Sequence, residues 1–185
     1  MRDFFEKQQV DIDKATIQKA KEFAEKVVST IDYGDSNQFD LNKIKDDHFI
    51  SKIGEEAAKK VFESLGRSVK GPDYAIYKKN QKSWDDDLYI DNEGLAVKTQ
   101  KRSAAERYGL SWTFQASSFR RDKILDKKDA WVCFVECNDK DNSFKCTVYP
   151  PYQMKELILG EPKLEHVKGK KKVAYASELP RIEKK

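Results

Sequence analysis

The chain has 185 residues, of which 37% are charged and 38% hydrophobic, and its formal net charge is +4. This length is typical of a single domain, and so mild a charge permits a polyanionic partner without demanding one. No apolar run approaches the roughly 20 residues of a membrane helix, so we expect no membrane partner and a cytoplasmic location.

Two amphipathic helices are predicted in the first third of the chain. Apolar residues recur at helical spacing over residues 13–31 and again over residues 46–65, and Gly66 is suited to end the second helix. On this second helix Glu56 falls on the polar side, whereas Glu55 borders the apolar stripe. Glu55 is therefore a candidate for a special role.

A strand over residues 68–78, with a bend at Pro72 and Asp73, and then a β-hairpin are predicted next. Residues 87–90 and 95–99 are the β-prone runs of the hairpin. We expect a loop centred on residues 92–93, followed by Gly94, which can take positive φ.

This loop fixes which side chains of the hairpin share a face. Side chains alternate along a strand, so the face with the charges is separated from an apolar face. The predicted pairs on the charged face are Tyr89 with Ala96, Asp87 with Lys98 and Asp85 with Gln100. A surface salt bridge explains the charge pairing of Asp87 and Lys98 as well as a functional site does.

The hairpin resembles the active-site motif of the PD-(D/E)xK, or restriction-endonuclease-like, superfamily. Asp87 matches the Asp that begins the second core strand of that family. Ala96, Val97 and Lys98 lie where D/E-x-K belongs, with alanine in place of the second carboxylate. Asp73 also follows a proline and is the runner-up for this acid, but we interpret it as a turn residue, because proline removes a strand hydrogen bond there and Asp73 lies farther in sequence from Lys98 than Asp87 does.

The resemblance implies an α/β sandwich around a small mixed β-sheet flanked by helices. The whole chain would be one nuclease-like domain with its core at about residues 50–149, to which the helix at 13–31 and residues 150–185 are additions. The substrate implied is DNA, hydrolysed at its phosphodiester bonds. A homodimer is expected, because one small site cuts one strand at a time.

The resemblance also assigns roles to residues. Asp87 and Glu55 would hold Mg²⁺ or its substitute Mn²⁺, and one or two carboxylates can suffice because Mg²⁺ keeps several waters. Glu55 resembles the Glu that the family carries on the helix before the first core strand. Lys98 would act on the attacking water or the developing charge, and Gln100 would orient water or phosphate. The further candidates for the missing carboxylate are Asp85 and Asp86.

The region after the hairpin is rich in cations. A helix is predicted to begin near Ser103, where Ser-Ala-Ala-Glu has the form of a capping box. Arginines interleaved with aromatic rings suit phosphate contacts and base stacking, although a solvated charged face explains them too. The candidate nucleic-acid-binding residues are Arg102, Arg107, Gln115, Arg120 and Arg121, together with Lys170, Lys171 and Lys172 near the C-terminus.

Residues 130–137 form the most hydrophobic run and are predicted to be a central strand buried on both faces, with residues 144–149 as its neighbour. A short helix is expected at residues 152–159. The three cysteines, Cys133, Cys137 and Cys146, are an odd number, which favours buried reduced thiols over disulfides or a zinc site.

Three hypotheses about function follow. The first is a metal-dependent DNA endonuclease of restriction or phage type. The second is a weakened relative that binds DNA without cleaving it, which Ala96 makes reasonable. The third is an unrelated structural or interaction protein whose hairpin charges are ordinary surface.

Overall fold

The structure, a computed structural model, describes residues 1–29, 40–77, 86–140 and 144–183. Its helices and strands follow in the order β1 (Gln8–Asp11), α1 (Lys14–Val28), α2 (Leu41–Ser64), β2 (Val69–Lys70), β3 (Leu88–Ile90), β4 (Glu93–Lys101), α3 (Arg102–Tyr108), β5 (Ser111–Gln115), β6 (Trp131–Asn138), β7 (Lys145–Val148), β8 (Tyr152–Gln153) and β9 (Lys171–Tyr175). The predicted mixed α/β class is confirmed.

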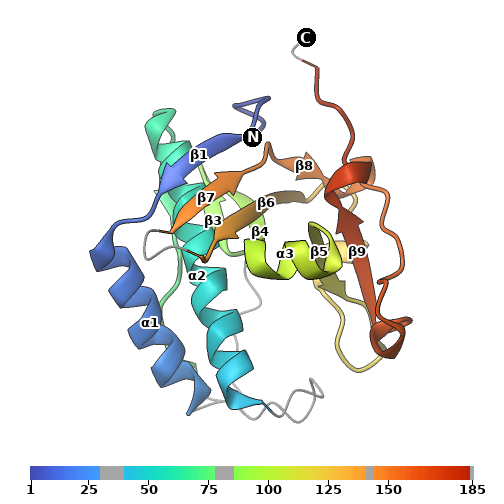
Figure 1. Cartoon of the computed structure of the whole chain (residues 1–185). Helices are drawn as coiled ribbons and strands as arrows, with labels where there is room; N and C mark the ends of the chain where they lie inside the picture. The colour runs from blue at the N-terminus through green and yellow to red at the C-terminus, as the bar shows by residue number, and fades with distance from the viewer. Residues whose placement is uncertain (30–39, 78–85, 141–143, 184–185) are drawn as a thin grey trace.

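Within the described residues, a seven-stranded mixed sheet has the order β1-β7-β6-β4-β3-β2, and β8 also pairs with β6. β4 and β6 run parallel, whereas the other neighbours in this sheet are antiparallel. β5 and β9 form a separate antiparallel pair. Figure 1 shows α1 and α2 on one side of the large sheet and the β5–β9 pair on the other.

The large sheet separates two hydrophobic cores. The first lies against α1 and α2 and includes Ile53 of α2 and Val97 of β4. The second lies against the β5–β9 pair, where the rings of Trp112 and Phe134 stack with centroids 4.6 Å apart. β6 contributes to both cores, which explains its nearly continuous apolar run and confirms the prediction of a strand buried on both faces. The three cysteines are free and buried, as predicted.

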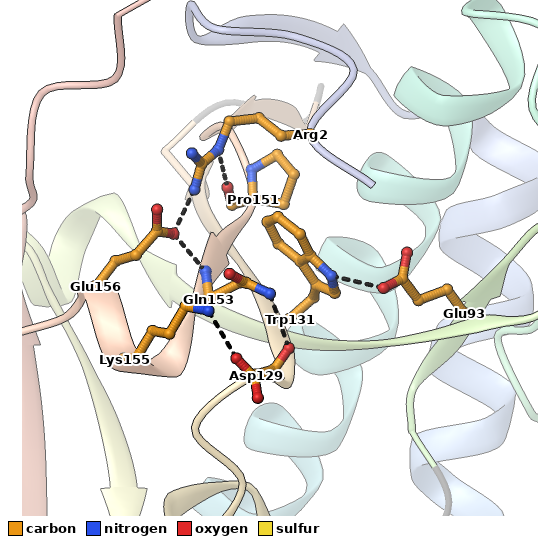
Figure 2. A network of polar contacts seen from close by, with 8 residues as sticks. All are labelled: Arg2, Glu93, Asp129, Trp131, Pro151, Gln153, Lys155 and Glu156. Atoms are coloured by element: carbon orange, nitrogen blue, oxygen red, sulfur yellow. Dashed lines mark hydrogen bonds and ion pairs between the residues drawn. The ribbon is translucent and has the colours of Figure 1, made fainter.

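The N-terminal residues are tied to the end of the sheet by a polar network (Figure 2). The Arg2 Nε donates a hydrogen bond to the Pro151 carbonyl oxygen at 2.9 Å, and its guanidinium also pairs with Glu156. The guanidinium lies 5.5 Å from the ring centroid of Trp131, whose indole N–H donates to Glu93 at 2.7 Å. The N-terminal residues are thereby linked to the start of β4, the start of β6 and the β8 region.

Both predicted helices are confirmed, with shifted bounds. α1 ends at Val28, and the predicted end at Ile31 lies outside the described residues. α2 begins earlier than predicted, because the Asp40 side chain caps its first turn by accepting from the backbone N–H groups of Asn42 and Lys43. Gly66 follows the end of α2 with a φ of 78°, the conformation that suits glycine there.

Three local predictions are wrong because tertiary contacts prevail over local sequence. Residues 152–159 are no helix: Tyr152–Gln153 pairs with β6, and only Met154–Glu156 forms a 3-10 turn. The predicted capping box at Ser103 is absent, since the backbone N–H of Ser103 donates to Asp139 at 3.0 Å instead. The expected strand at residues 68–78 shortens to Val69–Lys70 within the described residues.

No helix in the described ranges combines the length and the apolar character that crossing a membrane requires.

The closest approach between α2 and the sheet is at Gly54. A Cβ built on Gly54 would lie 1.8 Å from the Thr99 Oγ1 of β4, so only glycine fits there without movement. That hydroxyl oxygen is buried and has no hydrogen-bond partner, so its removal loses no hydrogen bond within the described structure.

We predict that Gly54→Ala lowers the free energy of unfolding by about 1–3 kcal/mol through overpacking. The loss of stability in the double variant Gly54→Ala/Thr99→Ala should be smaller than the sum of the two single losses, because the Oγ1 and Cγ2 contacts are gone and only the Cβ of residue 99, at 2.8 Å, still has to shift. Urea unfolding of the four proteins measures this coupling. Additive effects of the two substitutions would contradict the close approach.

Candidate functional site

The turn of the β3–β4 hairpin lies one residue earlier than the sequence predicts. Asp91 and Asn92 form the loop with φ of 46° and 73°, and Tyr89 pairs with Gly94 rather than with Ala96. A two-residue hairpin loop of this type needs positive φ at both central residues, which Asp and Asn tolerate well. The pairing therefore shifts by two residues, which leaves every side chain on its predicted face.

Gly94 does not adopt positive φ, so that prediction is also wrong. A Cβ at Gly94 would lie 2.0 Å from the Asp86 Oδ2, and glycine is needed for this close approach instead. Asp86 therefore lies over the start of β4. Asp85, the other additional carboxylate that we considered, lies outside the described residues.

Asp87 immediately precedes β3 and is half-buried. Its Oδ2 accepts a hydrogen bond from the backbone N–H of Val97 at 2.7 Å, so the carboxylate is fixed against β4. The shifted register means that Asp87 does not directly face Lys98 as predicted. Burial raises the pKa of Asp87, and the Val97 N–H and the charges of Lys98 and Lys52 oppose that rise.

Glu55 approaches Asp87 from α2. Only 2% of its surface is exposed, and it accepts hydrogen bonds from the Ser51 hydroxyl at 3.0 Å and from the Lys52 ammonium at 2.5 Å. Burial, followed by the negative charge of Asp87, raises the pKa of Glu55 to about 8, although Lys52 and Ser51 act in the opposite direction. Asp87 thus lies close enough to Glu55 to disfavour the ionisation of Glu55.

Lys98 lies on the other face of β4. Its ammonium is 2.7 Å from the Asp122 Oδ2 and 5.2 Å from the centroid of the Phe114 ring in the second core. Glu55 and Lys98 therefore approach Asp87 from opposite faces of the sheet rather than side by side. Lys52 and Asp122, the charged partners of these groups, were missed by sequence analysis because nothing in their local pattern marks them.

Gln100 joins β4 to the start of β5. Its amide nitrogen donates to the Gly109 carbonyl at 3.3 Å, and its amide oxygen accepts from the Ser111 N–H at 2.8 Å. Both ends of the amide are thus engaged in holding β5 next to β4. Its side chain also lines a pocket on the outer face of the β5–β9 pair.

The predicted nucleic-acid-binding residues divide into two groups. Gln115, Arg120, Lys170 and Lys171 line this pocket together with Gln100. The remaining four residues do not line it. Arg102 pairs with Glu136, and Arg107 lies over the ring of Tyr108. Arg121 pairs with Asp126, and Lys172 pairs with Glu161.

Across the described residues, no group of three or more His, Cys, Asp or Glu side chains is arranged to hold a metal ion. Glu55 and Asp87, whose charges interact, are a pair and so fall short of such a group. Ala96, at the position of the family's second carboxylate, is only 9% exposed and belongs to the second core. Glu56, predicted on the polar side of its helix, is also buried and accepts from the Tyr74 hydroxyl at 3.0 Å.

Comparisons with known proteins give no match to a family model, to a curated protein or to a solved structure. The resemblance to the restriction-endonuclease-like superfamily therefore remains a prediction from the sequence.

The raised pKa of Glu55 predicts a pH dependence of stability. Because that pKa rises from 4.5 to about 8 on folding, the folded chain binds more protons than the unfolded chain in this range, and stability falls as pH increases. Glu55→Gln removes this titration. The parent should therefore lose about 1–3 kcal/mol of its free energy of unfolding between about pH 5 and pH 8 through this group, and Glu55→Gln should not. The variant thus becomes more stable relative to the parent as pH rises.

Urea unfolding at several pH values measures this difference. The matched control is Glu63→Gln, at a more exposed position on the same helix. Parallel stability curves for the parent and Glu55→Gln would show that Glu55 does not titrate in this range.

Proposed function

We propose that the chain is a metal-dependent nuclease that hydrolyses phosphodiester bonds in DNA, with its centre at Glu55, Asp87 and Lys98. The observation that carries the proposal is the arrangement around Asp87. This carboxylate is fixed to β4, shares its surroundings with the buried Glu55, and lies within the electrostatic reach of Lys98.

The order of elements supports the same proposal. α2 precedes β2, β3 and β4, and β3 pairs antiparallel with both β2 and β4. α3 then precedes β6, which is parallel to β4. The family resemblance implies a helix, a strand, a hairpin, a second helix and two further strands. The described chain has these elements in that order and adds β5 before β6.

The donors at the centre suit a hard divalent cation. Mg²⁺ binds oxygen ligands, keeps several waters and needs only one or two carboxylates, which Asp87 and Glu55 would supply. Their raised pKa values have the same physical cause, namely negative charge in a desolvated place, and a cation would relieve it. When bound, the ion would polarise the phosphate and stabilise the leaving oxygen.

Lys98 would place a positive charge at the phosphate or the attacking water. Its position is defined by Asp122 on one side and the Phe114 ring on another, and its side chain remains about one-quarter exposed. A preorganised ammonium costs little reorganisation at the moment of reaction, which is the usual source of electrostatic catalysis. Asp122 would then act as a positioning residue for Lys98.

We predict that the parent nicks supercoiled plasmid DNA in the presence of Mg²⁺ or Mn²⁺. Lys98→Ala should slow nicking by about 10²–10³, because it removes a charge that acts on the reacting phosphate. Asp87→Asn should cost at least as much, because it removes a metal ligand. Gel assays over a range of metal concentrations measure the rates.

The matched control is Lys101→Ala, which removes a lysine of the same strand that pairs with Asp46 instead. Circular dichroism tests whether each variant folds. A Lys98→Ala protein that is folded and cuts as fast as the parent would refute the assignment of the centre.

A second candidate function is DNA binding without hydrolysis. It is favoured by Ala96, which packs in the second core where the family pattern has a carboxylate. A parent protein that binds DNA but does not cut it with either metal would establish this alternative.

A further inference from the structure

A pocket of about 1010 Å³ lies over the outer face of the β5–β9 pair. Trp112 and Phe114 of β5 point into the second core, so the alternate residues of that strand face outward. The floor is formed by Ser111, Thr113 and Gln115 of β5 and by Lys171, Val173 and Tyr175 of β9. Residues 117–120, 162–164, 166–167 and 169–170 supply further lining. We call this pocket the β5–β9 groove.

The described lining of the groove is cationic and contains no Asp or Glu. Its basic side chains come from three separate parts of the chain and are Lys43, Arg120, Lys163, His166, Lys170 and Lys171. Burial and the charges of Lys43 and Arg120 lower the pKa of Lys171, while Asp47 and Asp122 act in the opposite direction. An anion bound here would relieve the repulsion among these cations.

Neighbouring residues outside the groove have different partners. Arg121 forms an ion pair with Asp126 at 2.9 Å, and Lys172 pairs with Glu161. Within the described residues, no carboxylate comes within ion-pair distance of Arg120 or Lys171. The fold therefore leaves only one cation of each adjacent pair available to a ligand in the groove.

Aromatic rings accompany these cations. Phe119 is 93% exposed although it is a large apolar side chain, and Tyr108 at the same groove is 39% exposed. Unpaired bases stack on such rings, whereas the bases of an intact duplex are stacked on each other and are not accessible. This combination of phosphate-binding cations and an exposed ring is the one that single strands require.

Two side chains, Gln100 and Asp122, link the groove to the proposed catalytic centre. Gln100 lines the groove and lies two residues from Lys98 on the same face of β4. The Asp122 Oδ2 accepts from the Gln115 backbone N–H at 3.2 Å and also from Lys98. Lys98 itself lies beside Phe114 on the inner face of the β5–β9 pair, so a strand in the groove would have to pass the end of β5, where Asp122 lies, to approach its ammonium.

We infer that the β5–β9 groove binds single-stranded nucleic acid, with phosphates on Arg120 and Lys171 and an unpaired base stacked on Phe119. The groove would present the strand to the Lys98 centre, and this second step rests on the proposed nuclease function. Binding itself does not depend on that function, so the two can fail separately.

The test measures fluorescence anisotropy of a labelled oligothymidylate of about 12 nucleotides, in EDTA and without divalent metal, using the full chain. The groove variant is Arg120→Ala/Lys171→Ala, and the matched control is Arg121→Ala/Lys172→Ala, which removes the same charge from the adjacent positions. The groove variant should bind about tenfold or more weakly and should reduce the slope of log K against log salt by about 1.4. The control should change affinity by less than about twofold.

Phe119→Ala tests the choice of a single strand. It should weaken binding by about 5-fold to 100-fold and leave the salt slope unchanged, because a stacked base contributes no counterion release. The parent should bind the single strand more tightly than a duplex of the same length. An oligouridylate arm shows whether the sugar is distinguished, and either sugar supports the inference.

Several outcomes would overturn the inference. Equal losses in the groove variant and the control would mean diffuse surface charge. Tighter binding of the duplex with no effect of Phe119→Ala, or a preference for vesicles that contain phosphatidylserine, would assign the groove to another ligand. If the groove variant binds more weakly but the parent does not cut DNA with metal, the binding inference holds and the proposed nuclease function is refuted. If the parent cuts DNA but the groove variant binds as tightly as the parent, the nuclease function holds and the binding inference is refuted.

Discussion

The parallel pairing of β4 with β6, from Leu95–Trp131 to Lys101–Cys137, is the constraint on which the other features depend. It joins the hairpin to the most buried strand of the sheet, and the contact of Gly54 with Thr99 fixes α2 across the same strand. Alternation along β4 then sends Val97 toward α2 and Lys98 toward the β5–β9 pair. One strand therefore positions both the candidate centre and one side of the groove.

The placement of Glu55 and Asp87 carries an energetic cost that the fold alone does not explain. A buried carboxylate loses hydration, which raises the pKa values of both groups, and the charge of Asp87 adds to the rise of the Glu55 pKa. The ion pair with Lys52 offsets part of the cost of burying Glu55. A buried ion pair, however, seldom stabilises a fold more than apolar residues of similar volume would. Carboxylates held in this way are typical of functional sites, where a cation or a substrate supplies the missing compensation.

The sequence predicts the elements whose pattern is long and regular. α2 and β6 follow from helical spacing and from a continuous apolar run, and both are confirmed. The register of the hairpin was predicted incorrectly, because two adjacent residues, Asp91 and Asn92, tolerate positive φ as well as a glycine loop would. β8 was predicted as a helix because its short sequence does not reveal that it pairs with β6. The partners of Lys98 and Glu55 were missed for a similar reason, since they lie on other elements.

The separation of cations into paired and available ones is likewise a property of the tertiary structure. Arg120 and Arg121 are equivalent in the sequence, and so are Lys171 and Lys172, but Asp126 and Glu161 pair with one member of each. Asp122 connects the groove to the candidate centre, because it binds Lys98 and its charge also opposes in part the lowering of the Lys171 pKa by burial. A phosphate on Lys171 would add a second negative charge near Asp122, and both charges would act on the ammonium of Lys98. Occupation of the groove and the orientation of Lys98 would then be electrostatically coupled through one side chain.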